Sequence, residues 1–93
     1  MKKIFTVYDS KAEAYLQPFF LDTVGMAIRA VSDCVNDVNH NFCRHAEDYT
    51  LFELGSYVES KGVFELHASP VSIGKLQEFK AQFELPVDQP SLV

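Results

Sequence analysis

The sequence predicts an α+β domain in which a four-stranded antiparallel sheet carries two helices on one face. Two pairs of aromatic and β-branched segments predict the strands, and each pair is followed by a helical signal, so the order is ββα then ββα. This order favours one sheet with its helices on a single side. We place the domain at residues 1–83 and an irregular C-terminal tail, marked by two prolines, at 84–93.

The first two strands are predicted at residues 3–8 and 14–20. Both runs are rich in aromatic or β-branched side chains, and Asp9-Ser10-Lys11 between them is typical of a turn. Pro18 lies inside the second run and has no N–H to donate. We therefore expect this strand at an edge of the sheet.

The first helix is predicted from an apolar period of 3.6 residues. Apolar side chains recur at i, i+3, i+4 and i+7, and they are Val24, Ala27, Ile28, Val31, Cys34, Val35 and Val38. Asp22 or Thr23 can cap its start, and the helix should end near residue 36. Residues 37–48 are predicted to form a polar loop, with Phe42 turned inward.

The second half repeats this pattern. Strands are predicted at 49–57 and 63–68, joined by residues 58–62, which contain the glycine that a hairpin loop of this length uses. Pro70 and Ser72 should open a second helix, whose buried side would be Ile73, Leu76, Phe79 and Phe83. The likeness of the two halves is either a weak internal repeat or the chance similarity of two hairpin–helix units.

The outer face of the predicted sheet is unusually apolar. Side chains alternate across a sheet, so one face, turned to the helices, would carry Phe5, Val7, Phe52, Leu54, Phe64 and Leu66. The other would carry Ile4, Thr6, Tyr8, Tyr49, Leu51, Tyr57 and Val63, with Glu53 and Glu65. Its tyrosines suit base stacking or a subunit interface, and a third alternative is that the tail or the long loop covers this face.

The net charge weighs against strong binding to nucleic acid. Thirteen acidic residues outnumber eight Lys and Arg, which gives −5, whereas DNA binding draws much of its affinity from cations that neutralise phosphates. The candidate cations are Lys2, Lys3, Lys11, Arg29 and Lys61. The two lysines in hairpin turns, Lys11 and Lys61, would join the N-terminal lysines in a patch if the turns share one end of the sheet; otherwise they are simply solvated. Arg29 on the polar helix face can instead pair with Asp33 at i+4.

No combination of residues predicts catalysis, a metal or a cofactor. The candidate metal ligands do not have the spacing of a zinc finger; they are Cys34, His40, Cys43 and His45. Cys34 also lies on the apolar helix face, where a free cysteine simply packs. Cys43 has histidines nearby, but a nucleophile needs a base within reach and a third group to orient that base. There is no glycine-rich phosphate loop either. We expect a protein that is not an enzyme.

The N-terminal sequence favours the cytoplasm in which the chain is made. Its apolar run ends at Asp9 and is shorter than the hydrophobic region of a signal peptide. No stretch approaches the roughly twenty apolar residues that span a bilayer. Nothing in the chain demands an oxidising compartment, so both cysteines are expected to be free thiols.

Several segments between Phe5 and Lys80 match a known family in order along the chain. They are Val7–Tyr15 with Pro18-Phe19, Ala27–Ala30 with Val35–Asp37, His45–Gly55, Gly62, Pro70–Gly74 and Glu78–Lys80. The chain thereby resembles the small nonstructural protein of gokushoviruses, a branch of the microviruses, which are single-stranded DNA bacteriophages. Segment 45–55 is the most specific. The chain departs from the family pattern at Val58, where the family tends to have an acid, and at Ala46, where it often has proline.

This resemblance implies a nonstructural protein of the host bacterial cytoplasm, with a role in DNA binding or in the switch to single-stranded genome synthesis. We therefore predict a homodimer, formed through the tyrosine-bearing face, that acts in viral DNA replication by weak single-stranded DNA binding or by recruitment. The alternative is an adaptor or inhibitor that binds a host or phage protein, such as a host replication protein, without touching DNA. The C-terminal Gln89–Val93 also loosely resembles peptides that dock on the bacterial sliding clamp.

Overall fold

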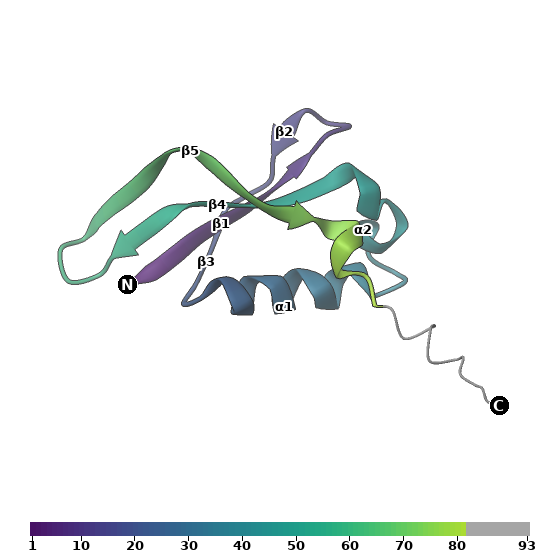
Figure 1. The fold of residues 1–93 in the computed structure, drawn as a ribbon, viewed down its shortest axis with the longest axis horizontal. Coiled ribbons are helices and arrows are strands. Elements are labelled where there is room, and N and C mark those ends of the chain that lie inside the picture. The colour runs from purple at the N-terminus through teal and green to yellow at the C-terminus, as the bar shows by residue number, and fades with distance from the viewer. Residues whose placement is uncertain (82–93) are drawn as a thin grey trace.

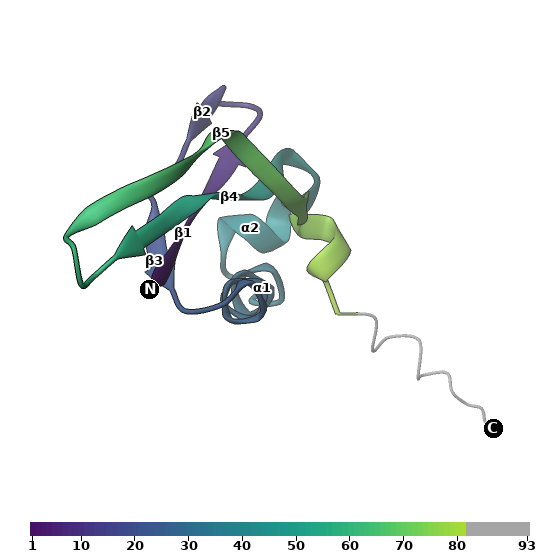
Figure 2. The same cartoon turned by 60° about the vertical axis from the view of Figure 1, so that its left-hand side comes forward.

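The computed structural model describes residues 1–81, and these form an α+β fold (Figure 1). A curled antiparallel sheet lies above one long helix, and Figure 2 views that helix nearly end-on. The tail predicted at 84–93, the predicted helical residue Phe83 and the peptide Gln89–Val93 lie outside the described residues.

The sheet has five strands, and the first strand of the chain lies inside it. β1 (Lys2–Asp9) pairs with β4 (Tyr49–Val58), and β4 pairs with β5 (Val63–Lys75). The other side of β1 is covered by two short strands, β2 (Ala14–Tyr15) and β3 (Phe19–Leu21). The strand predicted at 14–20 is therefore at an edge, as expected, but it is split around Pro18, which has no N–H to pair.

The predicted first helix is confirmed as α1 (Val24–Val35). The Thr23 hydroxyl caps it by accepting a hydrogen bond from the Met26 backbone N–H at 3.1 Å. Ala27, Val31 and Val35 are buried in the core. The prediction that Val38 belongs to the apolar face of this helix is wrong, because the helix ends before Val38 and the residue is 73% exposed.

The segment predicted as a loop contains two short helical pieces. These are the helix α2 (Asn41–Arg44) and the 3-10 turn η1 (Ala46–Asp48). Phe42 packs against the core as expected, and its ring centroid lies 4.6 Å from that of Tyr49.

The second predicted helix is wrong. Residues 70–75 continue β5, and only a 3-10 turn, η2 (Leu76–Phe79), follows. Val71 and Ser72 pair with β4, so pairing with a distant strand outweighs the local helix signal. In the possible internal repeat, Thr23-Val24-Gly25 of the first half corresponds to Ser72-Ile73-Gly74 of the second. The first triplet starts a helix and the second lies in a strand, so the two halves do not repeat one fold.

Several of the predicted strand faces are reversed, because β4 is irregular and because the hairpin sets Phe64 directly opposite Tyr57. Val7 pairs with Leu51 and Asp9 with Tyr49, which places Tyr49 and Leu51 in the core beside Phe5. Tyr49 and Tyr57 would share a face in a regular strand, but the register of β4 shifts near Glu53–Gly55. The side chains predicted to face the helices but found on the opposite face are Phe52, Phe64 and Leu66.

Candidate binding site on the outer face of the sheet

The sheet face opposite α1, here called the outer face, carries six aromatic rings in two groups. The hairpin cluster consists of Phe20, Tyr57 and Phe64, and the turn cluster consists of Tyr8, Tyr15 and Phe52. Ile4 and Thr6 alternate with the inward side chains of β1 and lie between the clusters; they are only 4% and 1% exposed. The outer face is therefore packed at its centre and exposes rings at both ends.

The hairpin cluster brings together rings from β3, β4 and β5. Strand pairing sets Phe20 opposite Ile4 and Phe64 opposite Tyr57. The Tyr57 and Phe64 ring centroids are 5.4 Å apart in a T-shaped arrangement, and Phe20 lies 6.3 Å from each. Phe20 is 44% exposed and Phe64 is 60% exposed, so large parts of two rings face solvent.

A shallow pocket of about 440 Å³ opens on this cluster. Its walls are the three rings together with the side chains of Lys2 and Glu59. Both its volume and its apolar walls with a few charged groups are typical of small-molecule sites. The pocket therefore offers stacking surfaces together with one cation and one anion.

The turn cluster is held by its own strand pairing. Tyr8 lies opposite Tyr15, with ring centroids 4.8 Å apart, and Tyr15 is 5.6 Å from Phe52. The Thr6 hydroxyl donates a 2.6 Å hydrogen bond to the Leu16 carbonyl, which fixes the connection between β2 and β3. This second group widens the aromatic surface along β1.

The cations near the hairpin cluster are largely engaged in ion pairs. The Lys2 ammonium lies 2.8 Å from an Asp22 oxygen, and this contact raises the pKa of Lys2 and lowers the pKa of Asp22. The N-terminal ammonium pairs with Glu59, and Lys3 lies 3.8 Å from Glu53. Glu53 Oε2 also lies 2.7 Å from His67 Nε2. These pairs leave Lys61 as the cation near the hairpin cluster without an ion pair among residues 1–81.

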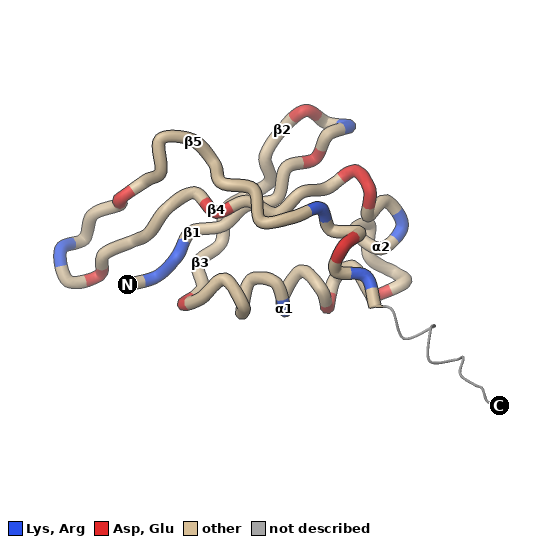
Figure 3. Tube along the Cα trace, viewed as in Figure 1, with Lys and Arg blue, Asp and Glu red and all other residues tan. Residues whose placement is uncertain are grey.

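The condition for a basic patch of turn lysines is not met, because the two turns lie at opposite ends of the sheet (Figure 3). Lys11 follows Asp9, the last residue of β1, which pairs with Tyr49 at the start of β4. Lys61 follows the other end of β4, where Tyr57 pairs with Lys2. Lys61 is exposed and has no ion pair among residues 1–81, so its ammonium group is available to a ligand bound at the hairpin cluster. Arg29 is exposed on α1, the helix that packs on the other face of the sheet, and it makes no ion pair with Asp33 in the described part of the chain.

The sequence pattern identified only part of this surface. Tyr8 and Tyr57 lie on it as predicted, and Lys2 borders the pocket at the hairpin cluster, whereas Tyr49 and Leu51 are buried in the core. The rings that sequence reasoning missed are Tyr15, Phe20, Phe52 and Phe64. Their aromatic character was visible, but their face depends on the hairpin register that sets Phe64 opposite Tyr57, on the shifted register of β4 and on the break at Pro18.

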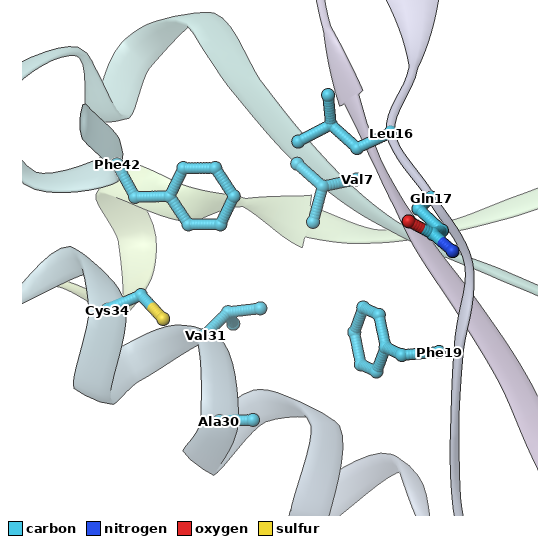
Figure 4. Close-up of a pocket in the computed structure, with 8 residues that line it drawn as sticks. All are labelled: Val7, Leu16, Gln17, Phe19, Ala30, Val31, Cys34 and Phe42. Atoms are coloured by element: carbon cyan, nitrogen blue, oxygen red, sulfur yellow. The ribbon is translucent and has the colours of Figure 1, made fainter. Parts of the chain in front are cut away.

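A second cavity lies between α1 and the sheet (Figure 4). It has a volume of about 260 Å³, and its lining residues are Val7, Leu16, Gln17, Phe19, Ala30, Val31, Cys34 and Phe42. Burial raises the pKa of the Cys34 thiol, which favours the protonated and unreactive form at neutral pH. This cavity is an apolar gap beside the core and offers no activated nucleophile.

The cysteines and histidines of the α2 region do not converge. His40 Nδ1 accepts a hydrogen bond from the Phe42 backbone N–H at 3.0 Å and so caps α2. Cys34 and Cys43 are free thiols. Within residues 1–81, no three His, Cys, Asp or Glu side chains are grouped to hold a metal ion. No helix in that part of the chain is long and apolar enough to cross a membrane.

Comparison with known proteins places the chain in a phage family. Neither a curated protein nor a solved structure matches it significantly. The family model described as Phage ORF5 protein matches residues 2–79, a span that runs from the start of β1 to the end of η2 and includes both aromatic clusters. This chain therefore belongs to the Phage ORF5 protein family.

Proposed function

We propose that this phage protein acts without catalysis in viral DNA replication, in the host cytoplasm, by binding single-stranded DNA weakly through its outer face. The hairpin cluster is the observation that carries this proposal, since Phe20 and Phe64 present exposed rings beside Tyr57. Aromatic side chains stack on any base and support binding without sequence preference. The resemblance to gokushovirus nonstructural proteins, which are associated with single-stranded genome synthesis, supports the same role.

Charge limits the affinity. Lys2 and Lys61 are the cations placed to meet phosphates near the hairpin cluster, and Lys2 must leave Asp22 to do so. Two phosphate contacts to a single strand give a slope of about −1.4 in log K against log salt. Raising the salt fourfold should therefore weaken binding only about sevenfold.

Fluorescence anisotropy of a labelled single-stranded oligonucleotide at low salt tests this proposal. Phe64→Leu should weaken binding about tenfold because it removes a stacking ring, whereas Phe64→Tyr keeps the ring and should retain affinity. Lys61→Ala should weaken binding, and the matched control Arg29→Ala on α1 should not. Absence of binding at low salt, or an equal loss for Arg29→Ala and Lys61→Ala, would rule the DNA role out.

A second candidate function is an adaptor or inhibitor that uses the same face to bind a host or phage protein. The net charge of −5 and the Glu59 carboxylate at the rim of the pocket favour it. It predicts no binding to the oligonucleotide even at low salt, and a purified protein complex that Phe64→Leu weakens. The anisotropy measurement therefore separates the two functions before any partner is identified.

A further inference from the structure

The outer edge of β5 is a long exposed strand edge. Residues 63–72 are exposed on both faces, and no other strand of residues 1–81 pairs with this edge. Its apolar side chains include Phe64, 60% exposed, and Leu66, 63% exposed. Unpaired edges of this kind are templates for pairing with another chain.

Protection of this edge begins only at its far end. Natural proteins protect an edge with lysines, proline, bulges or short length. In β5, Pro70 comes after residues 63–69, which include no lysine and only one acid, Glu65. Residues 67–70 also have no register partner in β4. The stretch 63–69 is therefore suited to accept a strand.

We propose that β5 pairs antiparallel with β5 of a second copy, across a twofold axis that passes beside Leu66. Directly opposite residues of an antiparallel pair point to the same side of the sheet. A twofold axis between two identical strands must therefore set one residue directly opposite its own copy, and that residue names the register. The possible registers are therefore few and can be compared one by one.

The charges on β5 favour the axis at Leu66. An axis on Glu65 would set two carboxylates against each other, and an axis on His67 would set two imidazoles together. An axis on Leu66 sets each Glu65 opposite the His67 of the second copy, and it sets each Phe64 opposite an Ala68. Like charges directly opposite each other are destabilising, and the axis at Leu66 avoids them while it sets a large residue beside a small one.

The neighbouring registers are poorer. An axis on Phe64 would bring Leu66 against Gly62, which lies in the hairpin turn at a φ of +67°. An axis on Ala68 would bring Leu66 against Pro70, which has no N–H to donate. The register at Leu66 pairs the seven residues 63–69 without a proline or a like-charge contact.

This dimer would join the outer faces of two copies. Phe64 and Leu66 follow the same alternation on β5, so the pairing would place the two hairpin clusters on the same face of one continuous sheet. The homodimer expected from the sequence is thus assigned to a strand edge rather than to the tyrosine-bearing face. The inference does not depend on DNA binding, and its test contains no DNA.

Disulfide trapping tests the register directly. In a Cys34→Ser, Cys43→Ser background, Leu66→Cys should cross-link to its own copy under mild oxidation, because directly opposite Cβ atoms lie about 4.5–5.5 Å apart. Phe64→Cys and Ala68→Cys should each cross-link poorly alone but efficiently when the two variants are mixed. Efficient self-linking of Glu65→Cys or His67→Cys in place of Leu66→Cys would overturn the proposed register.

Light scattering after size exclusion tests the dimer itself. The protein should elute as a dimer, and Leu66→Lys should shift it to a monomer that keeps the far-ultraviolet circular dichroism of the parent, because this side chain is exposed in the single copy. Val38→Lys, at a residue that is 73% exposed and follows α1, is the matched control and should remain dimeric. A parent protein that is monomeric at its highest soluble concentration would overturn the proposal.

Discussion

At the scale of single residues, Tyr49 shows how a buried tyrosine shapes stability at high pH. Its side chain is 9% exposed, packs against Phe42 in the core, and makes no hydrogen bond through its hydroxyl within residues 1–81. Burial, reinforced by the carboxylates of Asp9 and Asp48, raises its pKa above the ordinary value of 10.0. The neutral phenol is therefore the form that the folded protein prefers.

Tyr49→Phe should change how stability depends on pH. Because the pKa of Tyr49 is higher in the folded than in the unfolded protein, its contribution is complete below pH 10 and is lost as the pH rises through the folded pKa. Urea unfolding should give equal stabilities at pH 7, within about 0.5 kcal/mol, and a shallower decline above pH 10 for the variant. An identical decline for both proteins would contradict the burial of this phenol.

At the scale of elements, the irregular region of β4 decides which side chains reach the outer face. Gly55 lies in it with a φ of +154°, and a Cβ added there would meet the Leu66 Cα at 2.7 Å and the Glu65 carbonyl oxygen even more closely. These contacts are with backbone, so they cannot be relieved by rotating a side chain. The close approach of β5 at this point requires glycine.

Gly55→Ala should therefore destabilise the fold by about 3 kcal/mol or more. Gly62→Ala is the matched control: this glycine also has a positive φ, +67°, but it has open space around its Cα and should cost only about 1–2 kcal/mol. Chemical denaturation of both variants gives the comparison. Equal losses would show that β5 does not approach Gly55 closely.

The same elements explain what the sequence could and could not predict. α1 was predictable because its apolar period and its Thr23 cap are local signals. The end of β5 was not, since Pro70 and Ser72 look like a helix start while the pairing of Val71 with Glu53 is set by a distant strand. For the site, Tyr57 was placed correctly, but Phe64 was assigned to the other face although the hairpin sets it directly opposite Tyr57, and the shifted register of β4 wrongly exposed Tyr49.

At the scale of the whole molecule, the core closes only when η2 is in place. Leu76 is fully buried although it lies near the end of the described chain, and it belongs to the same core cluster as Phe5 and Val31. A chain of this size has a total stability of about 5–15 kcal/mol, so one core residue matters greatly. The two ends of the described chain therefore stabilise each other.

Leu76→Ala should cost about 2–5 kcal/mol, because it leaves a cavity between α1 and the sheet. Val38→Ala, at an exposed residue after α1, should cost less than about 0.5 kcal/mol. Thermal and urea unfolding of both variants at neutral pH test this. A small loss for Leu76→Ala would place η2 outside the cooperative core.

The central position of β1 has a consequence for synthesis on the ribosome. Lys2 pairs with Tyr57, and the core also needs Leu76, so β1 waits for partners that are translated well after it. At about 5–20 residues per second, β4 is complete roughly 2.5–10 s after β1. During that interval the nascent chain exposes the apolar residues of β1 without its main partner strand. Folding should therefore finish only after Leu76 has been translated, and the unfinished chain is the form most exposed to chaperones, proteases and aggregation.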